Sequence, residues 1–193
     1  MRDHVKSRAL PSLPIIAGIV ATLACPWQGS FGAEPRWPPG PYKYLVIDQD
    51  TRDVLNEFGQ NTNIPVAVSE QIRGHVRGPL PITSAEEFLR KLCESQGLVW
   101  YFDGTKLYVN PGSDIDSIMI TLTPVRFEDL SDRLDKLGIA DRRFPLNTTQ
   151  KGDAVLVSGP PRYLALVRQT YEALVRSAPR PNGDAVRVFR GSP

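Results

Sequence analysis

A short apolar run that ends in a Gly-Pro-Pro corner is the feature that most constrains how this chain folds. Residues 155–157 are Val, Leu and Val, which favour a buried strand. Gly159 permits a sharp change of backbone direction, and Pro161 suits the first position of a helix because its missing N–H has no intrahelical partner there. Residues 162–176 then follow a helical apolar pattern. The sequence therefore predicts a strand, a tight corner and a helix in immediate succession.

The first 32 residues are typical of a cleavable secretory signal. Basic residues precede a mostly apolar stretch over residues 10–24, which is shorter than the roughly 20 residues that a membrane-spanning helix needs. Ser30 and Gly32 place small residues at the usual spacing before a cleavage at Ala33. Cleavage near Ala24 is the alternative. The sequence predicts an exported chain and leaves the cleavage position open between these two.

The two cysteines do not predict an internal disulfide. Cys25 leaves with the signal if cleavage falls after Gly32; the alternative is that it carries a lipid, although the residues before it depart from the usual lipobox order. Cys93 lies among leucines of a predicted helix, which favours a buried small hydrophobe over a reactive thiol. We therefore expect the domains to be stabilised by their cores alone.

The charge of the exported part is balanced. The full chain has 23 Lys and Arg against 21 Asp and Glu. Three of the basic residues and one acidic residue lie in the signal, which leaves 20 of each in the remainder. A neutral chain has no basic field to attract nucleic acid or an anionic membrane surface, so we expect neither as a partner.

The remainder predicts an α+β protein made of two small α/β modules in tandem. The expected organisation is a Pro-rich lead over 33–43, a first module over 44–110, a linker over 111–116, a second module over 117–178 and a disordered tail over 179–193. Each module is near the lower size limit for an unaided core, which is a weak indication of assembly with neighbours.

Capping residues mark the helices of the first module. After a predicted strand over 44–47, Asp50 or Thr51 can cap a helix. Its inward face carries Val54, Leu55 and Phe58. A strand over 64–68 follows, and Thr83 with Glu86 forms a capping box before a second helix that ends near Gly97.

An Asp-Gly pair at 103–104 predicts a β-hairpin over residues 98–109. Four aromatic residues gather on it: Trp100, Tyr101, Phe102 and Tyr108. Because alternate residues of a strand face opposite sides, part of this group is core and part is exposed. The exposed part is a candidate contact surface, and the alternative is cross-strand pairing that stabilises the sheet.

The second module predicts the order strand, helix, strand, strand, helix, which is KH-like. RNA-binding KH domains use a Gly-x-x-Gly loop, whereas this chain has Gly159-Pro160-Pro161-Arg162, whose prolines remove backbone donors. Together with export and neutral charge, this argues against RNA binding.

The exported part contains no constellation of catalytic or metal-binding residues. His75 lies in a Gly-flanked segment where a solvated histidine is expected, and Ser158 lacks a nucleophile elbow and a base. Asp129, Asp132 and Asp135 alternate with basic residues and fit a solvated helix face. We expect no enzyme activity, no cofactor and no metal.

Both modules resemble the periplasmic N-terminal domains of secretins, the ring-forming outer-membrane channels of bacterial secretion systems. The first module matches their short N-terminal domain in Val54-Leu55-x-x-Phe58, in residues 63–69 and in Gly74-x-Val76-x-Gly78. The second module matches the next domain, and Val157-Ser158-Gly159-Pro160-Pro161-Arg162-Tyr163 is similar to the type III secretion branch. We expect no barrel domain in this chain, and in this respect it resembles the split secretins of nodulating rhizobia.

This resemblance implies a periplasmic, outer-membrane-associated ring component of a type III export channel with a part in nodulation host range. Implied partners are further copies of the chain, a separately encoded barrel subunit and the inner-membrane ring proteins, with membrane contact only through the partner unless Cys25 is lipidated. The predicted subunit interface consists of Trp100, Tyr101, Tyr108, Val155, Val157, Gly159, Pro160, Pro161, Arg162 and Tyr163. The alternative is a stand-alone periplasmic adaptor that contacts a transmembrane regulator through the first module.

Overall fold

The computed structural model describes residues 33–44, 48–78 and 84–178. The predicted signal with Cys25, the predicted tail over 179–193, Thr83 and most of the predicted strand over 44–47 lie outside these residues. Among the described residues, no helix combines the length and the apolar character needed to cross a membrane.

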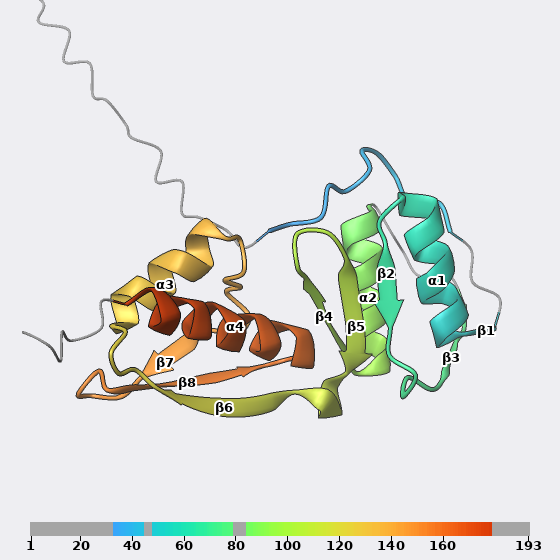
Figure 1. The fold of residues 1–193 in the computed structure, drawn as a ribbon. Helices are drawn as coiled ribbons and strands as arrows, with labels where there is room; N and C mark the ends of the chain where they lie inside the picture. The colour runs from blue at the N-terminus through green and yellow to red at the C-terminus, as the bar shows by residue number, and fades with distance from the viewer. Residues whose placement is uncertain (1–32, 45–47, 79–83, 179–193) are drawn as a thin grey trace, which may run out of the picture.

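The first module places two helices against one face of a small sheet (Figure 1). Its elements are β1 (Gln49–Asp50), α1 (Thr51–Thr62), β2 (Val66–Val68), β3 (His75–Val76), α2 (Ala85–Gln96), β4 (Leu98–Phe102) and β5 (Leu107–Pro111). Strands β2, β5 and β4 form the sheet in that order, with β2 parallel and β4 antiparallel to β5. Strands β1 and β3 form a separate antiparallel pair.

The second module has the predicted βαββα order. A 3-10 turn (Gly112–Asp114) leads into β6 (Asp116–Thr121), α3 (Phe127–Lys136), β7 (Leu146–Thr148), β8 (Ala154–Gly159) and α4 (Pro161–Ser177). The three strands are antiparallel in the order β6-β8-β7, and both helices cover the same face of this sheet (Figure 1).

Local sequence explains the boundaries of the helices. Asp50 caps α1 by accepting a hydrogen bond from the Arg52 amide, and Asn63 ends it in the left-handed conformation. Gly97 ends α2 in the same way. Pro161 is the first residue of α4, as the sequence predicts.

Three details differ from the sequence predictions. Ser84, not Thr83, caps α2, because its hydroxyl accepts from the Glu87 amide. The hairpin turn has four residues, 103–106, because Phe102 pairs with Leu107 and Asp103 bonds the amides that follow it. His75 lies in the short strand β3 rather than in a turn, although it is exposed as expected.

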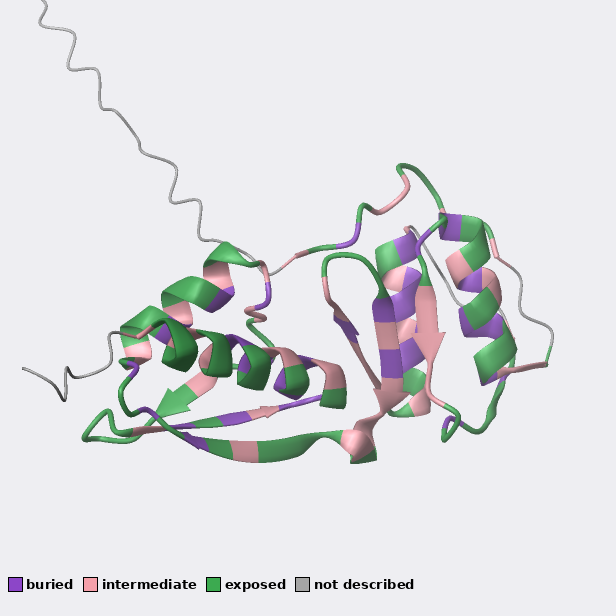
Figure 2. Cartoon of the chain, in the orientation of Figure 1, coloured by how far each residue is buried: buried purple, intermediate pink, exposed green. Residues whose placement is uncertain are grey.

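Buried apolar side chains form two clusters, one in each module (Figure 2). In the first, Val54, Leu55 and Phe58 are fully buried as predicted, and Phe58 stacks on Phe88. Cys93 is buried in this cluster, which confirms the prediction that it acts as a small hydrophobe. Burial raises the pKa of its thiol to about 12. The second cluster contains one residue of the first module, Tyr101.

Candidate assembly interface

Helices α1 and α2 cover one face of the first sheet, and the second module packs against the other face. Trp100 and Phe102 point to the helix side and pack against the first core. Tyr101 and Tyr108 pair directly across β4 and β5, so they share the opposite face. Tyr101 and Val99 pack against the second core. This contact, here named the junction, joins the hairpin of the first module to the corner before α4.

Two buried tyrosines form the centre of the junction. The rings of Tyr101 and Tyr163 meet edge to face with centroids 5.4 Å apart. Each hydroxyl donates to a backbone carbonyl of the second module: Tyr101 to Ile139 over 3.0 Å and Tyr163 to Phe144 over 2.8 Å. Burial raises the pKa of both phenols above the ordinary value, so the hydroxyls remain donors.

An ion pair closes the rim of the junction. Nε and Nη2 of Arg162 both donate to Asp103 Oδ2, over 3.0 and 2.8 Å, and the Asp103 side chain is only 4% exposed. Burial opposes ionisation of Asp103, but hydrogen bonds from Thr105, Lys106 and Arg162 outweigh it and lower the pKa of the carboxyl below its ordinary range. Arg162 also lies 5.3 Å from the centre of the Tyr108 ring.

The space before Tyr163 explains the glycine at the corner. A Cβ at Gly159 would lie 2.6 Å from Tyr163 Cδ1 and 3.3 Å from Phe144 Cγ. Gly159 ends β8, and its role is to let the Tyr163 ring approach the backbone rather than to supply the predicted reversal. The sequence analysis therefore identified Gly159 as important, but for a change of backbone direction rather than for the close approach of Tyr163.

The residues of the predicted subunit interface fall into two groups. Five have buried side chains or backbone inside this chain: Tyr101, Val155, Val157, Pro160 and Tyr163, with Gly159 buried beside them. Trp100, Tyr108, Pro161 and Arg162 keep exposed surface. The structure brings the hairpin and corner residues together within one chain, and it places Val155 and Val157 in the second core. Contact of the exposed members with another subunit stays a prediction.

Sequence inspection missed two charged residues in contacts between the two modules. Asp103 was interpreted only as a turn former, and Arg143 received no role. The Arg143 guanidinium carbon lies 3.7 Å from the centre of the Trp100 ring, which places a cation over the aromatic face. No local pattern links these positions, because the pairs are formed by folding of distant segments.

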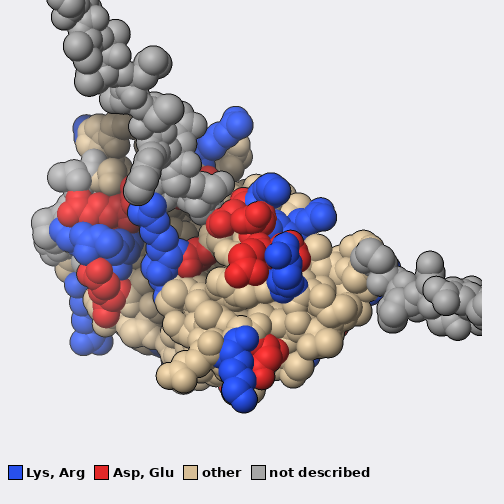
Figure 3. All heavy atoms as spheres, turned by 90° about the vertical axis from the view of Figure 1, so that its left-hand side faces the viewer, with Lys and Arg blue, Asp and Glu red and all other residues tan. Residues whose placement is uncertain are grey.

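Within residues 33–44, 48–78 and 84–178, no segment covers the outer face of the second sheet. Pairing places Met119 opposite Leu156 and Ser117 opposite Ser158 on this face. Met119 is 70% and Leu156 40% exposed. The outward positions carry no charge: Ser117, Met119, Thr121, Asn147, Ala154, Leu156 and Ser158. Figure 3 shows charged side chains gathered mainly on the upper, helix side of this end of the molecule and mostly uncharged atoms below.

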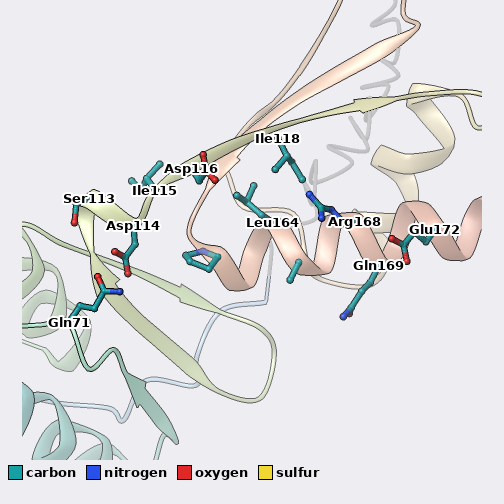
Figure 4. A pocket seen from close by; sticks show the side chains of 12 residues that line it. Gln71, Ser113, Asp114, Ile115, Asp116, Ile118, Leu164, Arg168, Gln169 and Glu172 are labelled. Carbon is teal, nitrogen blue, oxygen red and sulfur yellow. The ribbon is translucent and has the colours of Figure 1, made fainter.

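Two of the hollows beside the helices of the second module have leucines in their lining. One, of about 450 Å³, lies between α3 and α4 and contains Leu137, which is 56% exposed, together with Leu166 and Leu174. The other, of about 870 Å³, lies between α4 and the edge strand β6. Figure 4 shows Leu164 and Arg168 pointing from α4 toward Ile118, with Gln71 of the first module at the far end.

Two of the groups considered for chemistry form hydrogen bonds with neighbouring side chains. Ser158 bonds the Ser117 hydroxyl across the strands, and Asp129 bonds Arg126 on the exposed face of α3. Hydrogen bonding from Arg126 lowers the pKa of Asp129. Within residues 33–44, 48–78 and 84–178, no group of three or more His, Cys, Asp and Glu is placed to hold a metal ion.

Comparisons with known proteins agree with this architecture. Residues 44–110 match the family described as the N0 domain of the SPI-1 type 3 secretion system secretin. Solved structures of the Salmonella SPI-1 injectisome show the same fold. A chain of the basal body of InvG, PrgH and PrgK gives a TM-score of 0.64 at 24% identity, over 70% of this chain and 29% of that chain. A chain of the InvG N0N1:SpaPQR:PrgHK assembly gives 0.58 at 24% identity, over 75% and 99%.

Sequence relatives narrow the class from a secretin N-terminal part to a particular family. The type 3 secretion system secretin of Ralstonia nicotianae is 30% identical over 90% of this chain but only 28% of its own length. The nodulation protein NolW of Rhizobium fredii is 39% identical over 186 residues, which cover 92% of this chain and 76% of the relative. The chain belongs to the family of nodulation protein NolW. These relatives are named for nodulation and secretion rather than for catalysis.

Proposed function

We propose that this chain is a periplasmic ring component of a type III protein-secretion channel and acts in protein export and nodulation host range. It supplies the N-terminal portion of a secretin, and a separately encoded subunit supplies the outer-membrane barrel. The observation that carries the proposal is the pair of modules held together by the junction, because a rigid pair can present the same surface in every copy of a ring.

Two surfaces of the second module support contact between copies. The outer sheet face bears Met119 and Leu156, and the hollow on the helix side bears Leu137. Because these surfaces lie on opposite faces of the module, contact between them joins copies head to tail. A head-to-tail contact closes into a ring when its rotation allows closure.

The wider partners of the proposal are the barrel subunit and the proteins of the inner-membrane ring. The related Salmonella structures contain InvG together with PrgH and PrgK. By analogy, the exposed parts of the first module and the hollow between α4 and β6 are available for contact with proteins of the inner-membrane ring. Membrane contact occurs through the barrel subunit.

An affinity purification from detergent-solubilised envelopes tests this proposal. The tagged chain should elute in a megadalton-range complex, and mass spectrometry should identify a separately encoded, β-rich outer-membrane protein in it. Recovery as a monomer without such a protein would contradict the proposal and favour the stand-alone adaptor.

A matched pair of variants sharpens the purification. Met119→Glu places a charge on the uncharged sheet face and should release the chain from the complex. Lys151→Glu changes charge in the exposed turn before β8, outside the paired strands of that face, and should leave the complex intact. Equal recovery of both variants would argue against the sheet face as the contact surface.

A further inference from the structure

The N-terminal lead connects the two modules. The Ala33 amide nitrogen donates a hydrogen bond over 2.8 Å to the carbonyl oxygen of Gly138, just beyond the C-terminal end of α3. Pro35 is buried, and the Trp37 ring contacts Trp100 in the first module, with centroids 6.1 Å apart. Figure 1 shows the lead running from the loop after α3 toward α1. Ala33 is therefore the point at which the lead contacts the second module.

Glycines surround the side chain of Ala33. Gly138 and Gly104 have φ angles of 68° and 94°, which L side chains rarely adopt. A Cβ at these two glycines would lie 3.4 and 3.7 Å from the Ala33 Cβ. The methyl group thus sits between the hairpin turn of the first module and the end of α3 in the second. This position accepts a small residue.

We propose that the signal is removed by hydrolysis of the Gly32–Ala33 bond and that the resulting ammonium group of Ala33 binds the C-terminal end of α3. Water adds across the peptide bond, which leaves a carboxylate on Gly32 and an amine on Ala33 that takes up a proton at neutral pH. The inference rests on the export that the proposed function includes.

Charge makes the processed chain different from the precursor at this point. The C-terminal end of a helix carries a partial negative charge, so a cation there is favourable. In the precursor, or after cleavage near Ala24, the same nitrogen is a neutral amide with one N–H. Cleavage at Ala33 gives it a positive charge and three donors. Removal of the signal therefore strengthens the contact between the lead and the second module. Signal cleavage should thus increase the stability of the folded two-module chain.

The first arm of the test determines the N-terminus of the exported chain by intact-mass and peptide mass spectrometry. The expected terminus is Ala33. A terminus at Cys25 or at any other residue would overturn the proposal. Absence of the chain from the envelope would instead overturn the proposed function.

The second arm compares purified chains and needs neither export nor a partner. A chain that begins at Ala33 is compared with its Nα-acetylated form, which keeps an N–H but lacks the charge. It is also compared with a chain that begins at Gly32, in which the charge moves by about 3.8 Å. Both should melt roughly 2–4 °C below the chain that begins at Ala33, and 1 M salt should reduce the difference.

Acetylation of a chain that begins at Pro26 is the matched control, because the terminus of that chain lies seven residues before Ala33 and its contact with the end of α3. That modification should leave the Tm unchanged. Equal Tm values for the free and acetylated chains that begin at Ala33 would show that the ammonium group does not bind the end of α3. This result would overturn the proposal whether or not the chain is found in the envelope.

Discussion

The two three-stranded sheets differ in how many of their faces are covered. The first sheet has α1 and α2 on one face and the second module on the other, where Tyr101 is only 1% exposed. The second sheet has α3 and α4 on one face, and none of the residues that the structure describes covers the other, where Met119 is 70% exposed. The comparison indicates that the described residues cover both faces of the first sheet and only one face of the second, which is why the proposed contact between copies uses the open face.

The largest effect should follow from removing the centre of the junction. Tyr101→Ala deletes a buried ring that belongs to the second core and should lower the free energy of unfolding by about 3–5 kcal/mol. Urea unfolding followed by tryptophan fluorescence measures the change. Tyr101→Phe keeps the ring and loses only the bond to Ile139, so its loss should be about 1 kcal/mol. Equal losses for both variants would show that ring packing is not the main term.

Filling the space beside Tyr163 should have the next largest effect. Gly159→Ala places a methyl group within 2.6 Å of Tyr163 Cδ1 and should cost about 1–3 kcal/mol through displacement of the ring. Ser158→Ala, at the neighbouring outward position, serves as the control. Thermal unfolding of both variants should show a clear loss for the first alone, and an unchanged Tm for Gly159→Ala would refute the packing account of the corner.

Breaking the rim of the junction should cost less and depend on pH. Asp103→Asn should lower stability at neutral pH by about 1–2 kcal/mol, because Arg162 loses its charged partner while part of its surface remains in water. The folded-state pKa of Asp103 is lowered, so its contribution is complete above the ordinary carboxyl pKa of about 3.9 and is lost as the pH falls toward the folded value. Wild type and variant should therefore converge on acidification below about pH 4. A constant difference down to pH 2 would contradict the assigned ion pair.

The smallest effect on stability should come from the open sheet face. Met119→Lys combined with Leu156→Glu, which places opposite charges across the strands, should change the free energy of unfolding of the isolated chain by no more than about 0.5 kcal/mol, because both side chains already contact water. Urea unfolding checks this expectation. A large destabilisation would mean that the exposed pair contributes to the fold of the chain itself and would weaken the distinction between the two sheets.

Local signals predicted the elements of this fold better than their contacts. Asp50 and Gly97 mark helix ends correctly, and the Asp-Gly pair marks the hairpin, because caps and turns depend on neighbouring residues. The junction depends on residues far apart in the sequence: Asp103 with Arg162, and Tyr101 with Ile139. Periodicity within one strand shows that two faces differ, but it does not show what covers each face. The interface prediction therefore included residues that the chain buries itself.

Cysteine crosslinking in the envelope tests the central claim most directly. Copies with Met119→Cys and copies with Leu137→Cys are expressed together, while Tyr108→Cys replaces Met119→Cys in a parallel sample. Cys93 is buried and should not react. The account predicts a disulfide-linked dimer of chains for Met119→Cys with Leu137→Cys and none for Tyr108→Cys. Crosslinking through Tyr108→Cys, with none through Met119→Cys, would show that the junction rather than the open sheet face joins the copies and would contradict the account.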